Sequence, residues 1–107
     1  YAAGHEKPNS TFLSILHQIA IGIQNTQFQS YQIYIEVHTD SASIKTFKFP
    51  SNWELSSARA TFIARKLIQY QIPKSVIHAI GYSDSRPLTD NSFDFRNRRI
   101  VIKIYAD

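Results

Sequence analysis

Two oppositely charged side chains, Asp40 and Arg59, have the types and positions needed to hold a small zwitterion. Asp40 follows a segment that alternates apolar and polar residues, so it ends a predicted strand. Arg59 lies one turn inside a predicted helix, and neither residue belongs to a predicted core stripe. An aspartate accepts hydrogen bonds from an ammonium, and an arginine meets a carboxylate with a fork of donors. Alternatively, both are solvated charges or pair with each other.

The sequence lacks the patterns that indicate catalysis. It has no cysteine, which excludes disulfides, thiolate metal sites and a cysteine nucleophile. No serine lies in a Gly-x-Ser-x-Gly turn, and the three glycines form no phosphate-binding loop. His38 and Asp40 share one face of a strand and could begin a metal site. The other histidines have no spacing that would complete it: His5, His17 and His78. We therefore expect no enzyme, metal or cofactor, and we expect His38 to hydrogen-bond to neighbouring loops.

The composition is that of one globular domain. The chain has 107 residues, 43% hydrophobic and 19% charged, which suffices for a single core. Its net charge of +4 is scattered except for a basic cluster at 96–99 that runs directly into a predicted strand, so we do not expect nucleic acid as a partner. No apolar run reaches the roughly 20 residues that cross a bilayer. The chain begins with tyrosine and no signal peptide, so we expect a piece of a longer protein.

Hydrophobic periodicity predicts two helices. Asn9 or Ser10 is typical of an N-cap. The apolar positions that follow recur with the helical period, at Phe12, Ile15, Leu16, Ile19 and Ile23. A second helix begins at a capping box, in which Ser51 bonds the Glu54 amide. It ends before Pro73, which disfavours a helical residue in front of it. Its core stripe comprises Trp53, Ala60, Ile63, Ala64 and Leu67.

A period of two predicts the strands. Residues 31–38 alternate apolar and polar side chains, and two more strands are expected over 76–82 and at Ile100, Ile102 and Ile104. The loops are expected over 41–50 and 83–95, and a short strand over 1–4. These elements predict an α+β two-layer sandwich, with both helices on one face of a small mixed β-sheet. Residues 31–38 should form an interior strand, and Ile35 and Leu67 should be almost fully buried.

Four segments carry a resemblance to a known family. They are HTD (38–40), NWELSSARA (52–60), GYSDSRPL (81–88) and NRRIVI (97–102). In this order, and on these elements, they resemble the OmpA-like peptidoglycan-binding domain. The resemblance covers nearly the whole chain from Thr11 onward. FPSNWELSSARA (49–60) is most similar to flagellar motor stators of the MotB type, and IKTFKFPSNWELS (44–56) is similar to secretion-system cell-wall anchors.

The resemblance implies a cell-wall anchor. It implies non-covalent binding of the diaminopimelate in the peptide stem of peptidoglycan, by a periplasmic domain of a membrane-anchored or lipid-anchored envelope protein. Diaminopimelate ends in an ammonium and a carboxylate, which the resemblance assigns to Asp40 and Arg59. It also implies a homodimer in the intact protein and further subunits of a flagellar stator or secretion system as partners. The implied ligand-binding residues are Thr39, Asp40, Asn52, Leu55, Arg59 and Arg98, with backbone amides near Ser41 and Ala42.

Some positions leave alternatives open. Of Arg98 and Arg99, one is expected to bond the loops of the pocket and the other to face solvent or a helix end. Val37 replaces the glycine that the family usually has before HTD, and the loop over 91–97 is shorter than in the family. An alternative function is therefore a protein-interaction module that keeps the fold with weak or no peptidoglycan binding.

Overall fold

The computed structural model describes residues 8–25, 30–41, 49–91 and 95–106. In chain order its elements are α1 (Ser10–Gln24), β1 (Tyr31–His38), α2 (Asn52–Gln69), the 3₁₀ turn η1 (Lys74–Val76), β2 (Ile77–Gly81), the 3₁₀ turn η2 (Phe95–Asn97) and β3 (Arg99–Ala106). The predicted strand over 1–4 lies outside the described residues. In the described part of the chain, no helix is long and apolar enough to cross a membrane.

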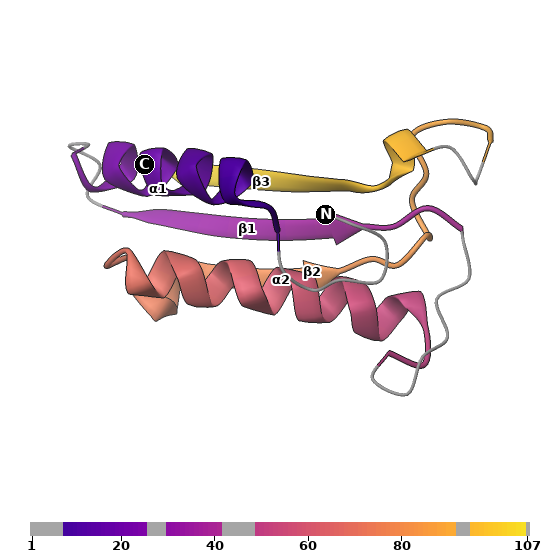
Figure 1. Ribbon diagram of the computed structural model, residues 1–107. Coiled ribbons are helices and arrows are strands. Elements are labelled where there is room, and N and C mark those ends of the chain that lie inside the picture. The colour runs from indigo at the N-terminus through magenta and orange to yellow at the C-terminus, as the bar shows by residue number, and fades with distance from the viewer. Residues whose placement is uncertain (1–7, 26–29, 42–48, 92–94, 107) are drawn as a thin grey trace.

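The described sheet has three strands in the order β2-β1-β3, so β1 is the interior strand, as predicted. It pairs parallel with β2, where Ile35 lies opposite Ala79, and antiparallel with β3, where Ile35 lies opposite Ile102. Both helices lie on one face of the sheet, α1 toward β3 and α2 toward β2 (Figure 1). The predicted α+β sandwich is therefore confirmed.

The core lies between this sheet face and the two helices. Ile35 is 0% exposed and Leu67 is 1% exposed, as predicted. Burying a large aliphatic side chain contributes about 1.5–3 kcal/mol relative to leaving it in water, and the core is built mainly from such side chains. Its buried members are Leu16, Ala20, Ile23, Ile33, Ile35, Val37, Ala60, Ile63, Leu67 and Ile72.

Three apolar residues of the predicted stripes are exposed instead. Ile15 is 53% exposed because the inward face of α1 runs through Leu16, Ala20 and Ile23, and position 15 lies on its flank. Trp53 is 52% exposed because the first turn of α2 extends past the end of β1, where no sheet lies beneath it (Figure 1). Ile104 is 42% exposed on β3, an outer strand of the described sheet.

Two local details also differ from the predictions. The Ser51 hydroxyl accepts from the Trp53 amide at 3.2 Å and donates to the Glu54 carboxylate. The backbone amide that Ser51 caps is therefore that of Trp53 and not that of Glu54, as had been predicted. The hydrogen bond from this hydroxyl holds the pKa of Glu54 below its usual value. β2 begins at Ile77, because the residues from Lys74 to Val76 form a 3₁₀ turn after Pro73.

Candidate ligand-binding site

The chain that leaves β1 is buried, and the turn after β2 holds it in place. Thr39 is 5% exposed and Asp40 is 9% exposed. The Thr39 amide donates to the Ser83 carbonyl oxygen at 2.8 Å, and the Tyr82 amide donates to the Val37 carbonyl oxygen at 2.9 Å. These bonds continue the pairing of β1 with the β2 side beyond the end of the sheet. They fix the backbone from which the Thr39 and Asp40 side chains project.

The Thr39 hydroxyl is buried, and no described residue gives it a hydrogen-bond partner. A buried hydroxyl without a partner costs free energy, commonly about 1–3 kcal/mol. Such a group gains when a ligand supplies the missing bond. Thr39 therefore has the chemistry of a ligand contact at the end of β1.

One face of α2 closes the site from the other side. Positions 52, 55, 56 and 59 follow the spacing of one helix face, which α2 turns toward the end of the sheet. The Asn52 side chain donates to the Asp40 carbonyl oxygen at 3.4 Å, which ties the start of α2 to the end of β1. Leu55 is 1% exposed and Arg59 is 2% exposed. The prediction that Arg59 lies outside the buried stripe is therefore wrong, because the buried face of α2 continues through it.

A serine contact and a glycine set how closely α2 approaches the turn after β2. The Ser56 hydroxyl accepts from the Ser83 amide at 3.1 Å and donates to the Trp53 carbonyl oxygen at 3.2 Å. Ser83 has a left-handed backbone with φ of 55°. At Gly81, an added Cβ would lie 2.4 Å from the backbone nitrogen of Ser57. Only glycine allows α2 to lie this close to the end of β2.

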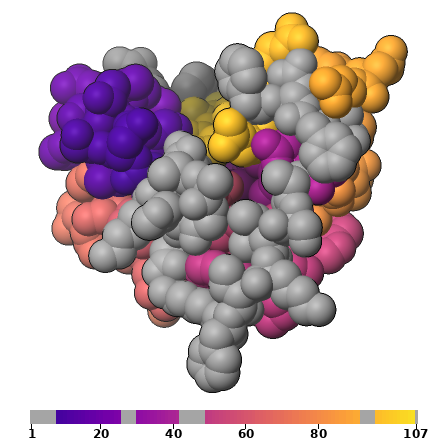
Figure 2. Space-filling model, turned by 45° about the vertical axis from the view of Figure 1, so that its right-hand side comes forward, coloured from indigo at the N-terminus to yellow at the C-terminus, as the bar shows by residue number. Residues whose placement is uncertain are grey.

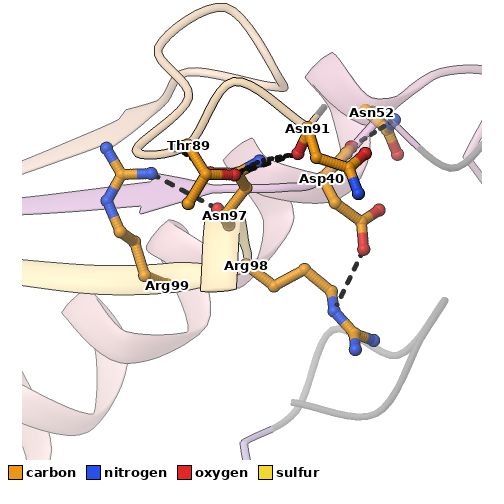
Figure 3. Close-up of polar contacts among 7 residues, drawn as sticks. All are labelled: Asp40, Asn52, Thr89, Asn91, Asn97, Arg98 and Arg99. Carbon is orange, nitrogen blue, oxygen red and sulfur yellow. Dashed lines mark hydrogen bonds and ion pairs between the residues drawn. The ribbon is translucent and has the colours of Figure 1, made fainter. Parts of the chain in front are cut away.

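Asn97 organises the loop that precedes β3. Its side chain is 1% exposed. The amide oxygen accepts from the Leu88 amide at 2.7 Å and from the Thr89 amide at 3.1 Å. The amide nitrogen donates to the Asn91 carbonyl oxygen at 3.0 Å. One side chain thus fixes the start of β3 relative to the loop, and with it the direction of the next residue (Figure 3).

The two arginines after Asn97 point in opposite directions (Figure 3). Arg98 turns toward Asp40, with 3.1 Å between its Nε and the Asp40 Oδ2. Arg99 turns away and donates to the Arg86 carbonyl oxygen at 2.9 Å. Arg99 therefore bonds the loop, as was expected of one of the two arginines. Arg98 is partly exposed but pairs with the Asp40 carboxylate, which was not among the expected contacts of the other arginine.

His38 is the last residue of β1, and its side chain lies on the opposite face of the strand from the core residue Val37. It is 4% exposed, and its ring stacks on Tyr82, whose other neighbour is the Arg86 guanidinium at 4.2 Å from the Tyr82 ring centroid. Its Nδ1 has no hydrogen-bond partner among the described residues, so this nitrogen makes no bond there to the loops. Burial, followed by the charge of Arg99, lowers the pKa of His38. No three histidine or carboxylate side chains of the described ranges gather as a metal site would require.

These contributions meet at one end of the molecule. Figure 2 turns this end forward and shows the end of β1 between α2 on one side and the start of β3 with the 83–91 loop on the other. Of the predicted ligand-binding residues, Asn52 and Arg98 bond Asp40, and Thr39 precedes Asp40 in the chain. Leu55 and Arg59 lie on the adjoining face of α2. The predicted amide donor at Ala42 and the centre of the shortened loop lie outside the described residues. Ser41 donates from its side chain to Asp84 at 2.9 Å.

A sequence profile of the OmpA family matches residues 9–100, which is most of the chain. The chain belongs to the OmpA family. This is a family of binding and structural domains rather than of enzymes.

Sequence relatives agree with membership of the OmpA family. The protein YtxE of Bacillus subtilis is 38% identical over an alignment of 112 residues, gaps included, and this alignment covers 97% of this chain and 43% of YtxE. Outer membrane porin F of Pseudomonas aeruginosa is 32% identical over 85 residues, covering 76% of this chain and 23% of the porin. The chain thus spans less than half the length of these relatives.

Solved structures share the OmpA-family fold. The C-terminal domain of Helicobacter pylori MotB superimposes with a TM-score of 0.84 at 24% identity, covering 100% of this chain and 81% of that domain. The cell wall anchor of the type VI secretion system from Pseudomonas aeruginosa superimposes with a TM-score of 0.82 at 29% identity, covering 100% of this chain and 75% of the anchor.

The departure at Val37 from the usual OmpA-family glycine is accommodated in the core. Val37 is 0% exposed and lies opposite Gly81 on β2 and Ile100 on β3. Its side chain is therefore part of the hydrophobic core between the sheet and the helices.

Three residues of this OmpA-family site carry roles that the sequence did not reveal: Ser56, Ser83 and Asn97. Ser56 and Asn97 accept from backbone amides of other segments through their side chains, and Ser83 bonds Ser56 and Thr39 through its backbone amide and carbonyl oxygen. Such partners depend on loop conformation, which hydrophobic periodicity does not report. The available signal was the position of these residues inside the segments 52–60, 81–88 and 97–102.

Proposed function

We propose that this OmpA-family domain binds peptidoglycan non-covalently and anchors a larger envelope complex to the cell wall. The ligand group is the free end of diaminopimelate in the peptide stem. The domain works in the periplasm as part of a protein that is anchored to a membrane, together with other subunits of a machine such as a flagellar stator or a secretion system. Its role is binding, without catalysis or a cofactor.

The observation that carries the proposal is the presence of opposite charges and an unused hydroxyl at one end of the sheet. Asp40 is largely buried at the end of β1, and Arg59 is buried on the face of α2 that adjoins it. Thr39 has a buried hydroxyl that lacks a partner among the described residues. A zwitterion complements such a site, because its ammonium is attracted to Asp40 and its carboxylate is attracted to Arg59. A purely anionic or purely cationic ligand would interact favourably with only one of these two side chains.

Each site residue has one task in the proposal. Asp40 accepts from the ligand ammonium, and Arg59 donates to the ligand carboxylate. Thr39 and Asn52 supply uncharged hydrogen-bonding groups, and Leu55 closes the apolar side of the pocket. Arg98 borders the ligand beside Asp40.

The named relatives support the proposed role as a cell-wall anchor. One structural neighbour is named as the cell wall anchor of a secretion system, and others are domains of the stator protein MotB. OmpA-like domains bind peptidoglycan and belong to envelope complexes.

The test is binding to purified peptidoglycan sacculi whose stems contain diaminopimelate. We expect the wild-type domain to sediment with the sacculi, and Asp40→Asn and Arg59→Lys to lose most of this binding. Truncating one partner of a desolvated charge pair costs roughly 2–5 kcal/mol. Lysine keeps the positive charge at position 59 but cannot reproduce the planar fork. Because Arg59 is buried, we prefer this replacement to alanine, which would also leave a void.

The matched controls change the same residue types on exposed parts of the chain. Asp90→Asn and Arg65→Lys should bind as the wild type does, and circular dichroism should show all variants folded. Full binding by folded Asp40→Asn and Arg59→Lys would remove the assignment of the pocket. A wild-type domain that ignores sacculi would instead favour the protein-interaction module.

A further inference from the structure

Arg98 holds the position that the proposed ligand ammonium needs. Its Nε lies 3.1 Å from the Asp40 Oδ2, a charge-assisted contact of the kind that an ammonium would make. The Asp40 side chain is only 12% exposed, so its charge is largely removed from water. A carboxylate in such surroundings requires a cation nearby. Arg98 supplies that cation from within the chain.

The structure lets Arg98 leave this position without disturbing its neighbours. The start of β3 is fixed by the four hydrogen bonds of the Asn97 side chain. Arg99 is fixed by backbone carbonyl oxygens. The Arg98 side chain, in contrast, is 37% exposed, and it turns toward Asp40 from the start of β3 (Figure 3). It can therefore swing away by rotating its own side-chain torsions, while the backbone of the site stays in place.

A ligand ammonium and the Arg98 guanidinium cannot share Asp40 at full strength. Two cations on one carboxylate repel each other, and this repulsion is weakly screened where the carboxylate is buried. The ligand carboxylate cannot relieve it, because the proposed function assigns that group to Arg59. Binding of the ammonium thus competes with the intramolecular ion pair.

We propose that Arg98 is a stand-in cation that keeps Asp40 paired until a ligand ammonium displaces it. The inference rests on the proposed function of the site. It makes Arg98 a residue that sets affinity by opposing binding, in contrast to a direct ligand contact. The apparent dissociation constant equals the intrinsic one divided by the fraction of molecules in which Arg98 has moved away from Asp40. A pair that is closed nine-tenths of the time would weaken binding about tenfold.

The experiment compares two soluble stem peptides by calorimetry, one with diaminopimelate and one with lysine at the same position. Lysine offers the ammonium but lacks the second carboxylate. The variants are Arg98→Gln, which removes the charge, and Arg98→Lys, which keeps it. Arg65→Gln is the control for net charge, since it removes an exposed arginine from the middle of α2.

A stand-in cation and a ligand contact predict opposite results. If Arg98 is a stand-in, Arg98→Gln binds both peptides about three- to tenfold more tightly and leaves the ratio between them unchanged, because both ammonium groups meet the same competitor. Arg98→Lys and Arg65→Gln should bind as the wild type does. If Arg98 contacts the ligand carboxylate, Arg98→Gln weakens the diaminopimelate peptide and reduces its advantage over the lysine peptide.

The outcomes also separate this inference from the proposed function. Unchanged or weaker binding by Arg98→Gln, with binding still lost in Arg59→Lys, overturns the stand-in role and leaves the proposed function standing. Failure of wild type and Arg98→Gln alike to bind either peptide overturns both.

Discussion

The side chains around the end of β1 differ in how burial and charge act on them. Asp40 is largely buried, and it pairs with a cation, Arg98. His38, the last residue of β1, is in the opposite situation. It stacks on Tyr82 beside Arg86 and Arg99, so a proton on its ring would be buried next to positive charges that Glu36 offsets only in part.

This environment predicts that the stability of the domain depends on His38 protonation. Because the folded pKa of His38 lies below its ordinary value of 6.5, the unfolded chain binds the proton more readily. The contribution to stability is complete above pH 6.5, and it is lost as the pH falls below that value toward the folded pKa. We expect the free energy of unfolding, measured with urea across this range, to decline more steeply in wild type than in His38→Gln.

The control for this prediction is His17→Gln, which replaces an exposed histidine of α1. It should keep the wild-type slope of stability against pH. An equal slope in wild type and His38→Gln would show that His38 is not responsible. The charges that face His38 come from Glu36 on β1, Lys103 and Arg99 on β3, and Arg86 in the loop after β2, and all four remain in both variants.

For individual residues, the sequence predicted which side chains lie at the site better than it predicted the contacts that they make. Thr39 and Asp40 follow a strand with a clear period, and Asn52 begins a helix with a clear cap, so their positions followed from the elements. The direction of Arg98 and Arg99 could not be predicted, since it depends on the hydrogen bonds of Asn97. The burial of Arg59 was missed because a guanidinium does not count toward an apolar stripe.

At the scale of elements, α2 lies so close to the end of β2 that an added Cβ at Gly81 would clash with the α2 backbone, whereas the other described glycine, Gly22, has open space. We predict that Gly81→Ala destabilises the domain by about 1–3 kcal/mol, because the new methyl group must push the α2 backbone at Ser57 away from the sheet. The displacement would also stretch the hydrogen bond from the Ser83 amide to Ser56. Urea unfolding measures the loss of stability, and binding to sacculi measures the effect on the site.

Gly22→Ala is the matched control, since it makes the same change in the middle of α1. An added Cβ at Gly22 meets nothing within 4 Å. Replacing a helical glycine by alanine there should stabilise the domain by about 0.5–1 kcal/mol. A neutral Gly81→Ala would mean that α2 can shift without cost, which contradicts the role given to this contact.

Element types were predictable because the chain changes cleanly between two hydrophobic periods. β1 has the predicted bounds, and the N-terminal cap of α1 is Asn9, one of the two residues predicted for it. Errors arose where the tertiary arrangement decides burial. Trp53 fits the stripe of α2 by spacing, yet its turn lies beyond the sheet. The short turn at Lys74–Val76 shows no sequence period that distinguishes it from a strand.

For the whole molecule, the proposed anchoring role predicts how copies associate. We expect the isolated domain to be monomeric or weakly dimeric at micromolar concentration, and the intact protein to be a homodimer. Two linked domains on one polymer gain avidity, commonly about a hundredfold or more, without any new contact. Sedimentation equilibrium of the domain measures its state, and a tight tetramer would contradict the expectation.

The interior position of β1 has a consequence for synthesis on the ribosome. Its parallel partner β2 is synthesised before its antiparallel partner β3, which contains the last described residues. Tyr31 can pair with Ala106 only after β3 has been synthesised. Until then, one edge of an apolar strand stays open to pairing with other nascent chains. The residues at the start of β3 and just before it are synthesised after β1 and β2 as well, and they include Asn97, Arg98 and Arg99. A chain released before β3 would therefore have neither the three-stranded sheet nor the residues that β3 and its preceding turn bring to the site.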